Sequence, residues 1–313
     1  MDVLRACLPP RALRISLIIF LVLGGARTSF AVEILAKVNT VHITDRDLEL
    51  EILSRSFDPD ELSEAERAKV LEDLIDRELV KQHLDELRVR SDRIQIAAQI
   101  KLLKEKIEAA EKEPEETLEA LGLSDVELQK RLRWASMWQN YFNQLIGEKE
   151  LQQYFEKNRQ KFDGTEFRAS QIFLKLPTNA TEQQIAEAKS KLAAYKQQIE
   201  SGQLNFAEAA QKWSEAPSAD RGGDLGFAPY GINRLKLFSE QLLPLEVGEI
   251  TEPFKSPFGV HLLMLTKKRP GAFEFVDVRP IVLQSLKAEL WETLVNEKRK
   301  TGRIQYTKSA PGR

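Results

Sequence analysis

The chain has 313 residues, with 46 basic side chains, 48 acidic side chains and one cysteine. This length is sufficient for two domains. Residues 1–31 hold four arginines and one aspartate, so the remainder carries 42 basic and 47 acidic residues, a net charge of −5. This excess of acidic residues argues against nucleic acid as a partner.

The first 31 residues differ in composition from the rest. Two arginines precede an apolar run over residues 15–26, which is too short to span a bilayer comfortably, and Ser29-Phe-Ala31 offers the small residues of a cleavage site. We expect residues 1–31 to be a secretory signal peptide, so that the mature protein is periplasmic or secreted, in a bacterial cell envelope, and touches a membrane only through this segment before cleavage. The alternative is an uncleaved anchor. Cys7 lies in this segment, so the mature chain has no disulfide and no thiol nucleophile.

The next stretch predicts a strand followed by helices. Residues 33–43 form the strand, and Thr44 caps the first helix. Apolar residues at helical spacing predict three more helices, over residues 63–87, 92–112 and 124–146. The acidic stretch 111–116 is expected to be a solvated connection. The order strand, Val-Asn, Ile-Thr-Asp-Arg-Asp-Leu, with Leu-Ile-Asp-Arg-Glu-Leu79 further on, resembles the SurA-type chaperone domain.

The predicted helix over residues 124–146 is apolar over more than one stripe. Trp134, Met137 and Tyr141 widen its regular apolar set. This width fits a helix that is buried on two sides. It also fits an aromatic surface that binds extended, unfolded peptide. We favour burial on two sides.

The central stretch combines strands, helices and a glycine-rich loop. Residues 167–175 are apolar and aromatic and predict a strand. A helix with a Thr-x-x-Gln capping box and a second short helix follow. The loop Arg221-Gly-Gly-Asp-Leu-Gly-Phe227 comes next, then a short helix, a turn into a strand, and a final apolar strand over residues 258–265. This order predicts a small α+β domain with a mostly antiparallel sheet.

The glycine loop and Phe-Gly-Val-His-Leu-Leu263, in this order of elements, resemble the parvulin-type peptidyl-prolyl isomerases over residues 165–270. The resemblance implies a parvulin fold and action on proline-containing, extended polypeptides. It makes His261 a candidate catalytic residue. It places Gln171 where the family usually has another histidine. It places Ala216, or Glu215 with a one-residue shift, where the family usually has cysteine or aspartate.

The resemblance also implies a set of substrate-binding residues. Phe238 matches the phenylalanine of the family's proline pocket, and the place of its methionine or leucine falls near Asn233 or Arg234, which are polar. The candidate substrate-binding residues are Phe238, Leu225, Phe227 and Phe258.

The chemistry required of such a site is modest. The barrier to X–Pro rotation is the partial double bond of the amide, so an apolar pocket and a polar network can lower it by differential binding. Glutamine at position 171 keeps hydrogen-bonding capacity, because its amide both donates and accepts. The three histidines lack metal-ligand spacing and no nucleotide-binding motif is present, so we expect no metal and no cofactor. His261 also fits a hydrogen-bonded core histidine.

The C-terminal stretch predicts a helix over residues 276–300 and a closing strand over 303–307. The SurA resemblance implies that this strand pairs near residues 33–38. The expected organisation is α+β: a mostly helical SurA-like domain over 32–163, completed by 272–308, with a parvulin-like domain inserted at 165–270.

Two functions are consistent with these features. The first is an exported, SurA-like folding factor that binds unfolded envelope or secreted proteins and carries a parvulin-type site with altered residues. The second is an active parvulin-type isomerase. The departures at Gln171 and Ala216 favour binding as the main activity, although fold alone does not settle function.

Overall fold

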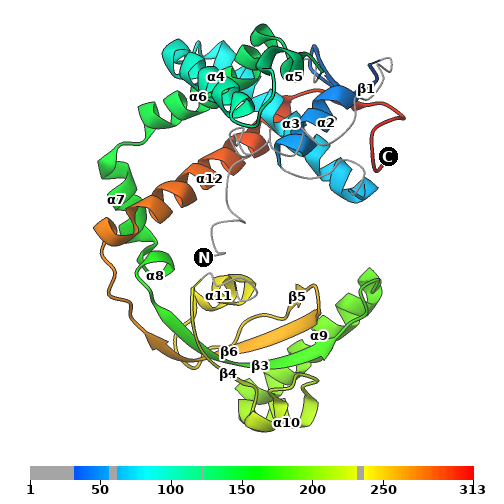
Figure 1. Cartoon of the computed structure of the whole chain (residues 1–313). Helices are drawn as coiled ribbons and strands as arrows, with labels where there is room; N and C mark the ends of the chain where they lie inside the picture. The colour runs from blue at the N-terminus through cyan, green and yellow to red at the C-terminus, as the bar shows by residue number, and fades with distance from the viewer. Residues whose placement is uncertain (1–31, 56–61, 121–122, 231–235) are drawn as a thin grey trace. The chain divides into compact units, whose positions relative to one another are not determined.

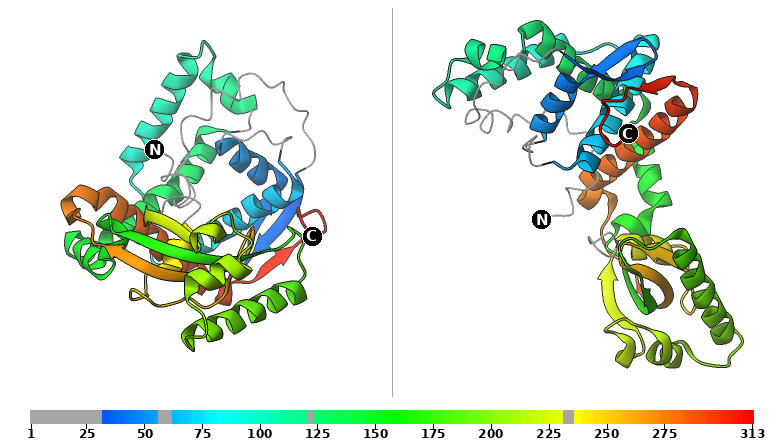
Figure 2. Two further views of the ribbon diagram at one scale, coloured as in Figure 1. Left: turned by 90° about the horizontal axis from the view of Figure 1, so that it is seen from below. Right: turned by 90° about the vertical axis from the view of Figure 1, so that its right-hand side faces the viewer.

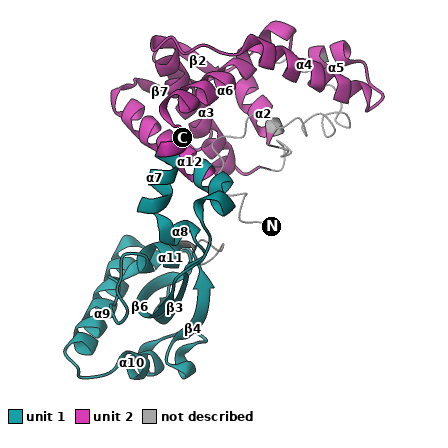
Figure 3. Cartoon of the chain, turned by 90° about the vertical axis from the view of Figure 1, so that its left-hand side faces the viewer, with its two compact units in different colours: residues 1–6, 150–283 teal, residues 7–149, 284–313 magenta. Residues whose placement is uncertain are grey.

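The computed structural model describes residues 32–55, 62–120, 123–230 and 236–313 (Figure 1). The expected signal segment and the two polar positions Asn233 and Arg234 lie outside the described residues. The chain divides into two compact units. One comprises residues 150–283, and the other comprises the residues up to 149 together with 284–313 (Figure 3).

The second of these units is mainly helical. Its elements are β1 (Ile34–Val38), β2 (Val41–Thr44), α2 (Asp45–Ser54), α3 (Glu64–Glu86), α4 (Arg93–Glu108), α5 (Pro114–Ala120), α6 (Asp125–Leu145), the later part of α12 (Phe275–Thr301) and β7 (Ile304–Tyr306). The strands form a sheet in the order β2-β1-β7. The C-terminal strand lies beside the N-terminal strands in both views of Figure 2. Ala36 pairs with Tyr306 and Val38 with Ile304, so the expected return of the closing strand to the N-terminal strand is confirmed.

Helix α6 is buried on two sides. Trp134, Met137 and Trp138 are each at most 7% exposed. The ring of Trp291 on α12 lies 5.8 Å from Trp134 and 5.2 Å from Trp138. The aromatic residues that widen the helix therefore form a core, and the alternative of an open aromatic surface for peptide is wrong.

The acidic connection expected over residues 111–116 is partly helical. Helix α4 ends at Glu108, and Glu111 has a positive φ of 59°. Helix α5 then begins at Pro114, because proline fits the first position of a helix, where its missing N–H costs nothing.

The other unit is built on a four-stranded antiparallel sheet in the order β4-β3-β6-β5. Its elements are α7 (Glu148–Lys157), α8 (Arg159–Phe162), β3 (Glu166–Lys175), α9 (Glu182–Glu200), α10 (Phe206–Trp213), the 3₁₀ turn η3 (Ala219–Arg221), β4 (Asp224–Pro229), α11 (Lys236–Leu242), β5 (Phe254–Ser256), β6 (Gly259–Arg269) and the start of α12. This arrangement confirms the expected α+β class. None of the described helices is long and apolar enough to cross a membrane.

The two faces of this sheet carry different cores because side chains alternate along a strand. Ile172 and Leu174 pack with Leu192 of α9 and Phe206 of α10. Phe167, Ala169, Leu263 and Leu265 form the opposite core with Leu242 of α11. The candidate site residues Gln171 and His261 belong to the strands at the centre of this sheet.

Candidate functional site

The pairing of β3 with β6 brings Gln171 and His261 together. Phe173 lies directly opposite His261, and Gln171 lies two residues earlier on the same face of β3. The His261 Nδ1 atom is 3.3 Å from Gln171 Oε1, and the His261 ring stacks on that of Phe173 with centroids 4.7 Å apart. The two candidate residues therefore form one polar contact set in an aromatic environment.

This contact is part of a longer chain of hydrogen bonds. His261 Nε2 lies 2.7 Å from Ser256 Oγ, which also accepts a bond of 3.1 Å from the Phe258 N–H. At the other end, Gln171 Nε2 donates to Ser218 Oγ over 3.3 Å. The four side chains Ser218, Gln171, His261 and Ser256 are called the relay below.

The direction of the relay follows from its donors and acceptors. An amide oxygen only accepts, so His261 must carry its proton on Nδ1 to bond Gln171 Oε1. In the neutral ring Nε2 then accepts the hydroxyl proton of Ser256. Burial holds the pKa of His261 down to about 4, since the side chain is shielded from water and only 5% of the residue is exposed. The relay is therefore uncharged near neutral pH.

The glycine loop fixes the position of Ser218. Gly223 has a φ of +81°, and a Cβ there would lie 2.3 Å from the backbone oxygen of Gln171. The Gln171 N–H donates to Gly223 O over 2.9 Å, and the Gly223 N–H donates to Ser218 O over 2.8 Å. Because glycine has no side chain, the backbone at Gly223 can lie directly against the backbone of β3. The glycine loop thereby places Ser218 beside β3.

Glu215 and Ala216 occupy different surroundings. The carboxylate of Glu215 accepts a bond of 2.6 Å from the Lys175 N–H, at the end of β3. Ala216 is buried, with 6% exposed. The structure thus joins Gln171 and His261 in the relay and directs the Glu215 carboxylate to a backbone amide.

Ser218 and Ser256 are the relay members that sequence reasoning missed. Ser256 precedes a tight hairpin in which it pairs with Gly259, so that its hydroxyl folds back toward His261. The Ser-Pro-Phe-Gly sequence signals such a turn and was the available clue. Ser218 had no comparable sequence signal, because its position depends on the path of the whole glycine loop.

Aromatic rings surround the buried histidine. Phe238 meets the His261 ring edge-on at 4.8 Å, and Phe254 stacks on it at 5.6 Å. Leu225 packs in the same apolar cluster as Phe238 and Phe254. Phe238 and Leu225 are therefore on the His261 face, as a wall for a proline ring requires.

Phe227 and Phe258 lie elsewhere. Phe258 is in the hairpin between β5 and β6 and is 63% exposed. Phe227 pairs with Arg168 after a shift of register in β4. Arg168 and the core residues Phe167 and Ala169 alternate along β3, so Phe227 faces away from the His261 core.

No group of metal-ligating side chains occurs among the described residues. The relay itself contains one imidazole, one amide and two hydroxyls. Such a neutral set can orient or hydrogen-bond a peptide group, and it supplies neither a carboxylate nor a thiolate.

Comparisons with known proteins identify one family match and several similar chains. Residues 172–267 match the rotamase family model, described as the PPIC-type PPIase domain. The chaperone SurA of Alcanivorax borkumensis is 32% identical over 133 residues, which cover 42% of this chain and 30% of the relative. SurA of Cupriavidus pinatubonensis is 28% identical over 281 residues, covering 79% of this chain and 52% of the relative. The chain thus spans about half or less of these relatives.

Among solved structures, the peptidylprolyl isomerase PrsA of Bacillus anthracis aligns with a TM-score of 0.40 at 20% identity, over 74% of this chain and 96% of that one. The family match begins at Ile172, one residue after Gln171, and includes His261. The expected resemblance to parvulins and SurA is confirmed. This chain carries a PPIC-type PPIase domain and is a homologue of the SurA chaperones.

Proposed function

We propose that this protein is an exported folding factor whose main activity is to bind unfolded polypeptides, and whose parvulin-type site isomerises X–Pro bonds weakly. The proposed organisation is a signal peptide over 1–31, a SurA-like domain over 32–163 completed by 272–308, and a parvulin-like domain over 165–270. Its clients are unfolded envelope or secreted proteins, including proline-containing segments, and its place is the periplasm or the exterior.

The neutral relay is the observation that carries this proposal. His261 has amide and hydroxyl partners. The resemblance puts Ala216, or Glu215 with a one-residue shift, at the place of the family's cysteine or aspartate; Ala216 is buried, and the Glu215 carboxylate is bonded to the Lys175 N–H. Catalysis requires groups that are stronger partners of the twisted amide than of the planar one. A relay without charge provides little of that difference, whereas holding a client requires only many weak contacts.

The burial of His261 supports the same conclusion. Only 5% of His261 is exposed, and the rings of Phe173, Phe238 and Phe254 surround it. The imidazole therefore affects a bound peptide mainly by holding the neighbouring side chains in position. We assign His261 and Gln171 to positioning. We assign Phe238 and Leu225 to the apolar wall of the proline site.

An active isomerase is the second candidate, and the continuity of the relay favours it. Ser218 supplies a hydroxyl to Gln171 where the family has a side chain at the Ala216 place. If that hydroxyl replaces the missing group, the polar network around the substrate carbonyl is complete. The mechanism would then be rotation about the C–N bond in an apolar pocket, with no bond made or broken.

Suppression of aggregation tests the proposal. The purified protein is mixed with a chemically unfolded, aggregation-prone substrate at ratios up to one to one, and light scattering is followed. The proposal predicts protection near stoichiometric ratios, equal for the wild type and for His261→Ala. Absence of protection at a one-to-one ratio would contradict it.

A further inference from the structure

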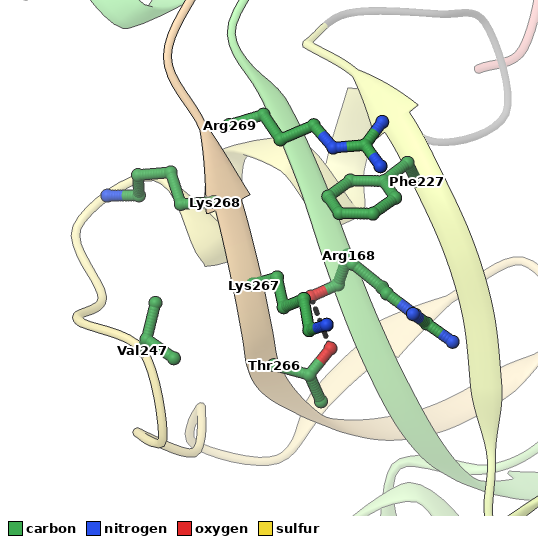
Figure 4. Close-up of a pocket in the computed structure, with 7 residues that line it drawn as sticks. All are labelled: Arg168, Phe227, Val247, Thr266, Lys267, Lys268 and Arg269. Carbon is green, nitrogen blue, oxygen red and sulfur yellow. Dashed lines mark hydrogen bonds between the residues drawn. The ribbon is translucent and has the colours of Figure 1, made fainter.

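The sheet of the PPIase domain has a second polar surface at the end remote from the relay. There, beyond the residues covered by α9 and α10, seven residues line a pocket of about 410 Å³ (Figure 4). Four of the seven are cations and none is a carboxylate: Arg168, Lys267, Lys268 and Arg269, with Phe227, Val247 and Thr266. The lining is thus strongly basic in a chain that is acidic overall.

Two of these cations oppose each other across the strands. Arg168 of β3 is the register partner of Lys267 of β6. Like charges directly opposite in an antiparallel pair destabilise a sheet. Arg168 is balanced by Asp224, with two bonds of 3.0 and 2.6 Å. Lys267 is exposed and has no ion-pair partner among the described residues.

Arg269 adds a third cation to this face. It lies two residues after Lys267 on β6, and its guanidinium is 3.6 Å from the centre of the Phe227 ring. Figure 4 shows the two side chains next to each other. Its Nη1 atom is 3.3 Å from Glu166. Stacking on an aromatic ring leaves the in-plane N–H groups of an arginine available to carboxylates. Lys268 points to the other side, where it bonds Leu245 O over 3.2 Å.

The spacing of these cations matches an extended polypeptide. Lys267 and Arg269 stand at positions i and i+2 of a strand, which are roughly 7 Å apart on one face. Carboxylates at i and i+2 of an extended peptide have the same spacing. Phe227 and Val247 offer apolar contact beside them. Carboxylates border the pocket as well: Asp224 pairs with Arg168, and Glu166 pairs with Arg269. On the other side Glu246 and Glu249 flank Val247, where the Glu246 N–H donates to the Glu249 carboxylate over 2.8 Å. Lys267 has no such carboxylate partner among the described residues, so it is the cation of this face that is open to a ligand.

We propose that this pocket binds acidic, extended segments of polypeptide, with Lys267 binding a ligand carboxylate and Arg269 available to the next one along the peptide. Because Asp224 already balances Arg168, the ligand carboxylate pairs with Lys267, whose charge has no carboxylate partner among the described residues. The pocket is on the opposite face from His261, so it selects clients without occupying the proline site. The class of ligand, an unfolded polypeptide, rests on the proposed function. Binding of an acidic peptide at this pocket can be measured whether or not the protein isomerises X–Pro bonds or suppresses aggregation.

The test uses a fluorescent peptide of twelve residues in which glutamate alternates with leucine, and a matched peptide with glutamine for glutamate. Binding to the purified protein is measured by anisotropy in low salt. We expect the glutamate peptide to bind and the glutamine peptide to bind at least about tenfold more weakly, and the difference should shrink at high salt because exposed charges are screened. Equal binding of the two peptides, or no binding of either, would overturn the proposal.

The sharpest variant is Lys267→Glu, which sets a carboxylate of the protein opposite Arg168. This internal carboxylate should displace the ligand, lowering affinity for the glutamate peptide about tenfold or more by repulsion, while the melting temperature stays the same or rises. Lys189→Glu, with the same charge change at an exposed position on α9, is the control and should retain binding. Equal loss in both variants would show attraction by net charge alone. Tight binding of a single-stranded oligonucleotide that Lys267→Glu abolishes, with weak peptide binding, would assign the pocket to nucleic acid instead.

Discussion

Deletion of residues 303–313 should destabilise the helical unit substantially, because it removes β7 from the edge of β1. The hydrogen bonds lost include Asn39 N to Arg303 O at 2.8 Å, Thr307 N to Leu35 O at 3.0 Å, Thr307 Oγ1 to Ile34 O at 2.7 Å and Arg303 N to Asn39 Oδ1 at 2.9 Å. Four bonds at about 1 kcal/mol each give a loss of about 4 kcal/mol. The buried Ala310, 3% exposed, adds to this loss.

A loss of this size lowers the melting temperature of the unit that contains β7 by roughly 10 °C. Tryptophan fluorescence is a suitable probe, because Trp134, Trp138 and Trp291 all lie in the core of the affected unit. Deletion of residues 311–313 alone is the control. It removes the exposed Arg313 ion pair with Glu72 and keeps β7 and Ala310, so it should cost less than about 1 kcal/mol. A deletion of 303–313 that melts like the full chain would refute the strand's contribution.

Three further predictions concern the site and the N-terminus. The pKa of His261 is lowered from 6.5 to about 4 in the folded protein, so this histidine takes up its proton in the unfolded chain first as the pH falls. The free energy of unfolding is therefore retained above pH 6.5 and declines toward pH 4 by up to about 3 kcal/mol. Denaturant titrations at pH 7 and 4.5 should show this decline to be smaller in His261→Asn, and an equal decline would contradict it. Glu215→Ala should lower the free energy of unfolding by about 1 kcal/mol, because the hydrogen bond from the Lys175 N–H is lost, and should leave the isomerase rate unchanged. A lower isomerase rate with an unchanged free energy of unfolding would give Glu215 a catalytic role. The mature protein should begin near Val32, and N-terminal sequencing that finds Met1 would disprove cleavage.

The sequence predicted the fold better than it predicted the site. Hydrophobic periodicity located α3, α6 and α9, and Thr181 caps α9 as the Thr-x-x-Gln box predicted. Gln171 and His261 were identified by the resemblance to the parvulin motifs, and the register of β3 and β6 brings them to one face. Ser218 was not identified, because its hydroxyl lies near Gln171 only when the glycine loop adopts its folded conformation. Phe227 faces away from the His261 core, because a one-residue register shift in β4 reverses the facing of a side chain, and the sequence gives no sign of that shift.

The C-terminal part of β6 was also not predicted from the sequence. The apolar run stops at Leu265, but the strand continues to Arg269, since its pairing with β3 extends through polar residues. Periodicity of apolar residues detects the covered part of a strand and overlooks a polar continuation. The basic pocket lies in that continuation, and so it had no counterpart among the sequence-based candidates.

Prolyl isomerisation, measured on a short X–Pro peptide, tests the central claim most directly: the neutral relay supports binding more than catalysis. The comparison is between the wild type, His261→Ala, and a double variant, Gln171→His with Ala216→Asp, that restores the family's residues. The account predicts a slow wild-type rate, little further loss in His261→Ala, and a faster rate in the double variant. A fast wild-type rate that His261→Ala abolishes, with aggregation suppression unaffected, would contradict it and make the protein an isomerase first.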